Sequence, residues 1–257
     1  MGGARREVRW ETLDASLLDD EGRAKVGATW LARMQQEHLA VGAFALLTSE
    51  LAAEGCNSTV LRLIARAPSD ELRHADVCRK VASALLGEEN VPRRLRGVPT
   101  VPEHAKLSTA ERTLLHVVEM CCLSETFTGV YLTQMLARAR EPAVRAALES
   151  LLEDEIDHGR VGWAYLASAR RLRASEALSR ELPDMIERTI GWVIDKARAH
   201  PEADDPKLEA FGYLGNDTGA ELAARTITDV VLPGFAAVQV DLGPTRERIA
   251  ERRWQSR

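Results

Sequence analysis

Hydrophobic residues recur along almost the whole chain with the period of an α-helix, and no alternating run bounded by turn residues predicts a strand. The pattern therefore predicts an all-α protein. Four long helical stretches come first, followed by two further long stretches and a short basic helix. The predicted ranges are 22–54, 58–86, 109–140, 142–173, 176–200, 218–240 and 245–254.

Particular residues refine these boundaries. Pro68 lies inside the second stretch, so this helix should kink there or restart just before Asp70. Residues 233–234, a Pro-Gly pair, predict a kink or break in the sixth stretch. Ser108 and Glu111 have the spacing of a capping box at the start of the third.

The connections between stretches predict the topology. Short turns near residues 55 and 141 make two antiparallel hairpins. Between them, residues 87–106 are rich in arginine and proline and can run the length of a bundle. Two hairpins joined by one long crossover form the ferritin-like kind of four-helix bundle. We expect a single domain over 1–257, with this bundle at 22–173 and additional helices packed on it at 174–257.

Each of the first four stretches has one glutamate at the centre of its apolar face, and two of these faces also include a histidine. A buried carboxylate costs several kcal/mol or takes up a proton. Four carboxylates in one core need counter-charge, which two divalent metal ions supply. The predicted metal ligands are Glu37, Glu71, His74, Glu125, Glu155 and His158.

The distances of these glutamates from the turns support this set. Glu37 and Glu71 lie 18 and 16 residues from Gly55, and the other two lie 16 and 14 residues from position 141. Antiparallel partners equidistant from their turn lie at similar heights, so all four carboxylates can meet in one layer. Glu119 fails this test, because it is farther from the turn and lies about 120° around the helix from Glu125.

The pattern Asp-Glu-x-x-His occurs twice, at 70–74 and 154–158. Its glutamate and histidine share one helix face and can bind one site together. One glutamate from each of two helices plus Glu-x-x-His from two others is the ligand set of di-iron carboxylate bundles. The repetition predicts a pseudo-twofold axis through the metal pair.

These residues resemble the ferritin-like di-iron carboxylate superfamily, which includes ferritins, rubrerythrins, ribonucleotide reductase small subunits and bacterial monooxygenases. The resemblance covers about residues 22–173, and Asp70-Glu71-Leu72-Arg73-His74 is similar to the DExRH pattern of the monooxygenase branch. It implies two iron ions, with manganese or a mixed Mn/Fe pair also accommodated by these ligands. It further implies that Asp70 and Asp154 orient the ligand histidines.

For function, the resemblance implies an oxidase or oxygenase that uses O2 as co-substrate to oxidise an unidentified small molecule. Electrons would come from an external donor, because the chain has neither a Rossmann glycine pattern nor an iron–sulfur cysteine set. Leu151 stands where the arylamine N-oxygenase branch has an extra histidine, which argues against that chemistry.

Other functions remain open. Iron storage, rubrerythrin-like or catalase-like peroxide detoxification, and a metal-free helical interaction module are the alternatives. A storage cage predicts a large assembly with many iron atoms per chain. An enzyme predicts about two metal ions per chain and a small oligomer such as a homodimer.

Small and reactive residues follow or precede the ligands by about one helical turn. Cys78 and Cys121 could line the metal chamber, although free cysteine is usually a small core residue. Thr126 lies next to a ligand. Four glycines also lie near the ligands, and they provide either space for a substrate or close helix packing. These are Gly42, Gly129, Gly159 and Gly162.

Composition excludes several other classes. The 34 Lys and Arg against 39 Asp and Glu give a net charge of −5 without a basic stripe, so nucleic acid is not the expected partner. The longest apolar run, 39–47, is too short to span a membrane. Four cysteines are too few for a disulfide scaffold at this length, which favours a cytoplasmic protein. Two divalent ions bound by four buried glutamates would reduce the net charge to about −1.

Overall fold

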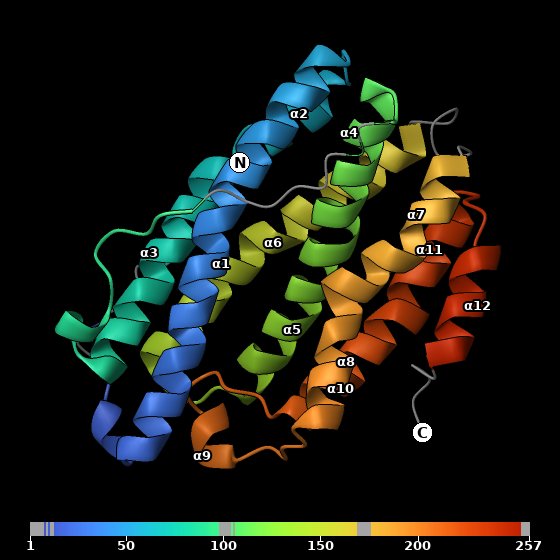
Figure 1. Cartoon of the computed structure of the whole chain (residues 1–257). Helices are drawn as coiled ribbons and strands as arrows, with labels where there is room; N and C mark the ends of the chain where they lie inside the picture. The colour runs from blue at the N-terminus through green and yellow to red at the C-terminus, as the bar shows by residue number, and fades with distance from the viewer. Residues whose placement is uncertain are drawn as a thin grey trace.

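The structure is a computed structural model that describes residues 13–97, 106–168 and 176–252, together with Val8, Trp10 and His104. Every regular element in these ranges is helical, so the predicted all-α class is confirmed. Long helices from the first two-thirds of the chain stand side by side, and helices from the C-terminal third pack against them (Figure 1). Among the described helices, none combines the length and hydropathy that a membrane span requires.

The first pair of long helices is antiparallel and packs along most of its length. The chain turns between them at Gly55, whose φ of +68° favours glycine. The predicted second stretch is two helices, because Pro68 occupies the first turn of the later one, where its missing N–H costs nothing. The restart predicted before Asp70 is therefore confirmed. The elements are α1 (Asp20–Ala53), α2 (Ser58–Ile64) and α3 (Ala67–Leu86).

The second pair begins at the predicted capping box. The backbone N–H of Glu111 donates to Ser108 Oγ at 3.3 Å, and the N–H of Ser108 donates to Glu111 Oε2 at 3.1 Å. A widened π-helical segment, which was not predicted, lies in the middle of this helix and ends immediately before Glu125. The elements are α4 (Thr109–Val117), the π segment η4 (Val118–Ser124), α5 (Glu125–Arg138) and α6 (Pro142–Ser168).

Two predicted segments fall partly outside the described residues. Of the predicted crossover at 87–106, the structure describes a short 3₁₀ turn, η3 (Glu88–Asn90), and the chain up to residue 97. Residues 98–103 and 105 lie outside the description. The predicted end of the fourth stretch, at 173, falls on residues 169–175, which also lie outside it.

The C-terminal third forms a layer of shorter helices. The predicted stretch 176–200 is confirmed, with a π segment inside it, and the predicted basic helix is present to residue 252. One short helix, α9, was not predicted. The elements are α7 (Glu176–Ile186), η5 (Glu187–Gly191), α8 (Trp192–Ala199), α9 (Pro206–Glu209), α10 (Asn216–Arg225), η6 (Thr226–Val231), α11 (Leu232–Ala237) and α12 (Gly243–Arg252).

The helix is not broken at Pro233-Gly234, which was one of the two outcomes predicted there. Pro233 lies in the first turn of α11, and the irregular hydrogen bonding occurs before it, in the π segment η6. A proline removes the N–H that would continue an α-helical ladder, so the disturbance falls on the preceding turn. The helix also ends at Ala237 rather than at Val240.

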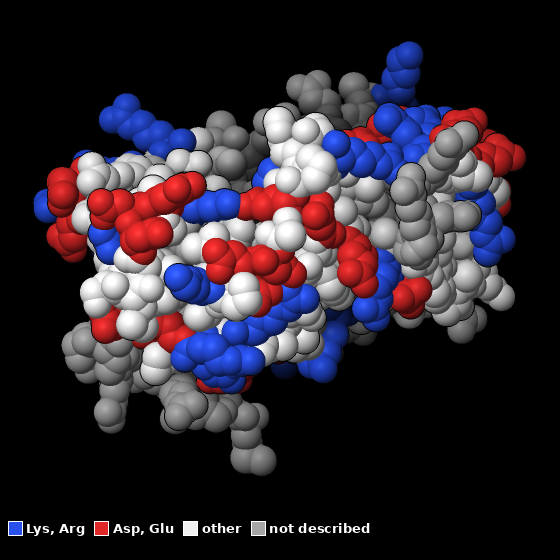
Figure 2. All heavy atoms as spheres, turned by 90° about the horizontal axis from the view of Figure 1, so that it is seen from below, with Lys and Arg blue, Asp and Glu red and all other residues white. Residues whose placement is uncertain are grey.

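The C-terminal layer shares its core with the long helices. One set of contacting buried side chains extends from Phe44 of α1 to Phe235 of α11. On the opposite side, the indole N–H of Trp30 donates to the backbone oxygen of Phe211 at 3.0 Å. Acidic and basic side chains are interspersed on the face seen in Figure 2. The C-terminal layer is thus positioned to contribute to any site between the long helices.

Candidate metal centre

The side chains of all six predicted ligands lie together between the four helices that carry them. Each is almost fully buried, with at most 6% of its surface exposed. Glu37 comes from α1, Glu125 begins α5, and α3 and α6 each supply a glutamate and a histidine. Glu119 lies outside this cluster and pairs with Arg188 at 2.5 Å.

These residues form two overlapping groups. Within each group, one oxygen or nitrogen atom per residue lies within 4.8 Å of the others. Glu71 and Glu155 belong to both groups. Each of these two glutamates could therefore contribute to both candidate metal sites. The groups are Glu37, Glu71, His74 and Glu155, and Glu71, Glu125, Glu155 and His158.

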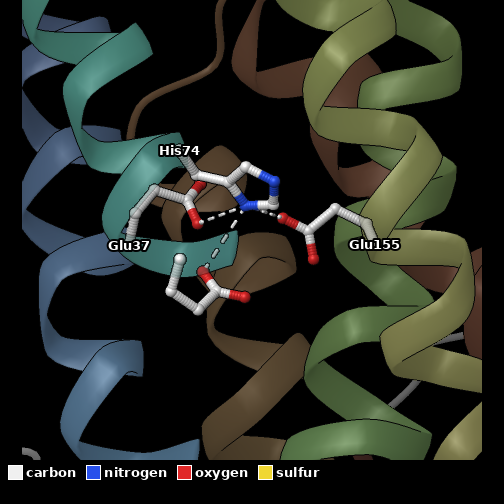
Figure 3. Close-up of side chains that lie close together, drawn as sticks. Glu37, His74 and Glu155 are labelled. Carbon is white, nitrogen blue, oxygen red and sulfur yellow. Dashed lines mark ion pairs between the residues drawn. The ribbon is translucent and has the colours of Figure 1, made fainter. Parts of the chain in front are cut away.

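The histidines face the glutamates through Nδ1. His74 Nδ1 lies 3.1 Å from Glu155 Oε1, 3.6 Å from Glu71 Oε2 and 3.8 Å from Glu37 Oε2. In Figure 3, Glu37 and Glu155 approach His74 from opposite sides. His158 Nδ1 lies 3.0 Å from Glu71 Oε1 and 3.4 Å from Glu155 Oε2. Each histidine is thus nearest the glutamate of the other motif, as the predicted pseudo-twofold relation requires.

The two aspartates lie behind the histidines, also in a crossed arrangement. His74 Nε2 donates to Asp154 Oδ2 at 3.3 Å, and His158 Nε2 lies 3.8 Å from Asp70 Oδ2. The sequence suggested an orienting role for both acids without indicating that each would face the histidine of the other helix.

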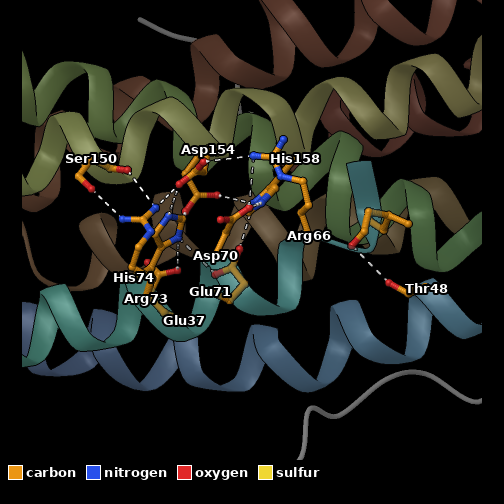
Figure 4. A network of polar contacts seen from close by, with 12 residues as sticks. Glu37, Thr48, Arg66, Asp70, Glu71, Arg73, His74, Ser150, Asp154 and His158 are labelled. Atoms are coloured by element: carbon orange, nitrogen blue, oxygen red, sulfur yellow. Dashed lines mark hydrogen bonds and ion pairs between the residues drawn. The ribbon is translucent and has the colours of Figure 1, made fainter. Parts of the chain in front are cut away.

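Three arginines next to this cluster were not predicted. Arg73 forms an ion pair with Asp154 and donates to Ser150 Oγ at 2.7 Å, and Arg66 lies 3.9 Å from Asp70 (Figure 4). Arg33 lies 3.6 Å from Glu37, one helical turn away on α1. Its i, i+4 spacing from Glu37 was a signal that the sequence offered.

Several atoms within the cluster are buried without a hydrogen bond. They include Glu71 Oε1, His74 Nδ1 and Glu155 Oε1, all of which belong to the two groups. Leaving such atoms unpaired is costly, and native proteins seldom do so. Carboxylate oxygen and imidazole nitrogen are ligands for iron and manganese. The residues present could therefore hold a metal ion in each group.

Burial and crowding shift the pKa values of the glutamates. Desolvation, with the charges of Glu155 and Glu71, raises the pKa of Glu37 to about 8. Desolvation and the neighbouring Glu155 raise the pKa of Glu125 well above its ordinary value. Although burial opposes it, contacts with Glu125 and the two histidines lower the pKa of Glu155.

The pKa values of both histidines are raised, which favours their charged form. Burial alone would lower the pKa of His158, but its contacts with Asp70, Glu155 and Glu71 raise it to about 12. Asp154 and the three nearest glutamates likewise raise the pKa of His74, against the effect of burial. The contacts with the carboxylates thus favour the protonated form of each histidine.

The cysteines and glycines that the sequence placed near the ligands lie around the cluster. Cys78 and Cys121 are fully buried near the cluster, and desolvation raises both thiol pKa values. Gly162 provides close packing, because a Cβ there would lie 2.6 Å from Cys121 Cβ. By contrast, a Cβ at Gly129 would meet no atom within 4 Å. The glycines therefore divide between the two predicted roles.

Two cavities open onto the cluster. The α6-side cavity, of about 500 Å³, lies between α5, α6 and the segment α10–η6, and it reaches Glu125 and Glu155. The α1-side cavity, of about 530 Å³, lies between α1, α5 and the segment η5–α8, and it reaches Glu37, Glu71 and Glu125. Both volumes are typical of sites for small organic molecules. All three π segments contribute lining residues, in keeping with the frequent occurrence of such segments at functional sites.

Comparison of the chain with protein-family models, with curated protein sequences and with solved structures gives no match. The geometry of the cluster and its two cavities is therefore the basis for assigning a function.

Proposed function

We propose that this protein is a ferritin-like di-iron oxidase or oxygenase that uses O2 to oxidise a small organic molecule. In this proposal α1, α3, α5 and α6 are the four-helix bundle that holds the metal pair. The observation that carries it is the pair of overlapping ligand groups with Glu71 and Glu155 in common. A carboxylate shared by two groups suits two metal ions held close together better than one ion.

The charges of the cluster agree with two divalent ions. Four glutamates carry a formal charge of −4, which two such ions balance, and the neutral histidines complete the set. Glu37, Glu71, His74 and Glu155 would hold one ion, and Glu71, Glu125, Glu155 and His158 would hold the other. Carboxylate and imidazole ligands accept Mn as well as Fe.

A bound ferrous pair would supply two of the electrons that, with two protons, the conversion of O2 and a substrate C–H group into a hydroxylated product and water requires. The chain's own residues hold the pair, exclude bulk water and fix the histidines. Asp154 is hydrogen-bonded to Nε2 of His74 and Asp70 lies 3.8 Å from Nε2 of His158, so the Nδ1 atom of each histidine faces the glutamates and would be available to a metal. An external donor then restores the two electrons.

The cavities support an enzyme over a storage protein. Both reach the carboxylates and have the volume of a small-molecule site, whereas storage requires only a route for ions.

Rapid mixing of the anaerobic Fe(II)-loaded protein with ¹⁸O₂ tests the proposal. We expect O2 consumption that depends on added reductant. An oxygenase would place one ¹⁸O atom in its product. An oxidase would remove two electrons from its substrate without adding ¹⁸O. Many iron atoms accumulating per chain without substrate oxidation would identify a storage protein instead. Reaction with H2O2 but not with O2 would identify a peroxidase.

A further inference from the structure

Two glycines shape the inner wall of the α6-side cavity. Gly129 lies one turn after Glu125 on α5, and Gly159 lies one turn after Glu155 on α6. A Cβ at Gly129 would meet no atom within 4 Å, and one at Gly159 would meet Thr126 Oγ1 first, at 3.7 Å. Gly129 therefore leaves open space beside Glu125, and Gly159 lets the wall beside Glu155 lie close to α5.

The aromatic wall of this cavity is held in one orientation. The indole N–H of Trp163 donates to Thr126 Oγ1 at 3.2 Å, and its ring centroid lies 5.1 Å from that of Phe235. A Cβ at Gly234 would lie 2.7 Å from the Trp163 ring, so glycine allows the indole to lie against the backbone of α11. Trp163 thus presents a fixed, flat surface beside the cluster.

The C-terminal layer completes the cavity, and the cationic residues of its lining lie at its mouth. Leu222 and Thr226 are buried wall residues of α10 and η6. The cationic residues are exposed and paired: Arg160 donates to Asp157 at 3.0 Å, and Arg225 lies 3.7 Å from Asp229. The cavity therefore has apolar walls between the carboxylates at its inner end, Glu125 and Glu155, and the paired charges at its opening.

The α1-side cavity also has apolar walls, but more charged side chains line it. Arg33, with 13% of its side chain exposed, lies deep within it, 3.6 Å from Glu37. Glu119, Arg188 and Lys196 line its outer part. An apolar molecule entering here would remove water from these charges, at a considerable cost.

From these contrasts we propose that the α6-side cavity is the substrate chamber, and that the substrate is a flat, largely apolar molecule with a polar group at one end. Its apolar part lies between Trp163 and the two glycines, where offset stacking on the indole is favourable. The polar end lies at the mouth, near Arg160 and Arg225. The inference rests on the proposed function and gives the C-terminal layer a role, namely to close the chamber.

Binding of N-phenyl-1-naphthylamine, a neutral aromatic probe that fluoresces in apolar surroundings, tests this assignment in the full chain. Gly129→Leu fills the α6-side cavity without an initial clash, and Ala40→Leu adds similar bulk to the α1-side cavity. We expect one probe per parent chain, a Kd at least tenfold higher in Gly129→Leu, and a Kd within twofold of the parent in Ala40→Leu. Circular dichroism and anaerobic Fe(II) uptake establish that both variants are folded.

Two results would overturn the assignment: no saturable binding to the parent, or equal binding by the parent and Gly129→Leu. Loss of binding in Ala40→Leu alone would place the ligand in the α1-side cavity and would also contradict it. Metal uptake separates this failure from that of the proposed function. If all three proteins bind two irons but Gly129→Leu retains the probe, the chamber alone is wrong. If the parent binds no iron, the proposed function fails and the chamber with it.

Discussion

His74 of α3 and Asp154 of α6 are joined by a hydrogen bond of 3.3 Å between Nε2 and Oδ2. The two residues belong to different Asp-Glu-x-x-His motifs, and the reciprocal pair, His158 and Asp70, lies 3.8 Å apart. Each motif therefore positions the histidine of the other. This exchange connects α3 to α6 across the cluster and makes the two halves of the candidate centre interdependent.

Replacing Asp154 by asparagine should weaken metal binding by about 10–100-fold, as is typical when the group behind a ligand histidine is altered. The substitution retains an acceptor but removes the charge that faces His74 and Arg73. Anaerobic titration with Fe(II) against a competing chelator measures the effect. Asp157→Asn is the matched control, since Asp157 lies on the same helix and pairs with Arg160 at 3.0 Å. Equal affinities of the two variants would contradict an orienting role.

Metal uptake should release protons. The pKa of Glu37 is raised to about 8 and that of His158 to about 12, and those of His74 and Glu125 are also raised. Glu37 and His158 therefore hold protons near pH 7, and two divalent ions would displace them. We expect a release of about two or more protons per metal pair at pH 6.5, measured in weak buffer. Affinity should increase as the pH rises through 8, because Glu37 is then already deprotonated. Uptake without acidification would count against this account.

Replacing glycine by alanine should have opposite effects on stability at positions 129 and 162. Gly129→Ala should increase the free energy of unfolding by about 0.5–1 kcal/mol, because alanine favours the helix and its Cβ meets no atom within 4 Å. Gly162→Ala should decrease it by about 1–3 kcal/mol, because the new Cβ would lie 2.6 Å from Cys121 Cβ and 2.7 Å from Cys122 Sγ. Urea unfolding of the metal-free proteins measures both. Changes of the same sign would be inconsistent with the packing described.

The C-terminal layer should depend on Asp204. Its Oδ1 accepts from the N–H of Gly215 at 2.8 Å and its Oδ2 from Thr218 Oγ1 at 2.6 Å, and it also pairs with Arg138 of α5. Asp204→Ala should lower the free energy of unfolding by roughly 1–3 kcal/mol. Glu221→Ala, at an exposed position of α10, is the control and should change it by less than about 0.5 kcal/mol.

The contribution of Asp204 should also depend on pH. Partial burial would raise its pKa, but the contacts with Thr218, Gly215 and Arg138 lower it below the ordinary value. A lowered pKa gives stability that is fully present above about pH 4, the unfolded value, and is lost as the pH falls through the folded pKa. The difference between parent and Asp204→Ala should therefore shrink in acid. A difference that persists at pH 2 would point to packing rather than charge.

The all-α class and the position of the glutamates follow from local rules. Glu37, Glu71, Glu125 and Glu155 interrupt apolar stripes of period 3.6, and burial of such a stripe carries its acids inward whatever the details of packing. The capping box at Ser108 is equally local, because it involves a single helical turn.

Features that depend on tertiary packing were not predictable in this way. The π segment before Glu125 shifts the helix by a residue, and the neighbours of a helix decide whether such a shift is tolerated. The crossed contact of Asp154 with His74 depends on the relative orientation of α3 and α6. The same holds for Arg66 and Arg73, because both contact Asp154 of α6.

Counting the iron bound per chain tests the central claim most directly. The full chain and its Glu71→Ala, Glu155→Ala and Glu119→Ala variants would be dialysed anaerobically against Fe(II), with circular dichroism to establish folding. We predict two irons for the parent and for Glu119→Ala, and fewer than one for the other variants, because Glu71 and Glu155 belong to both ligand groups. A parent that binds no iron, or a Glu71→Ala variant that still binds two, would contradict the account.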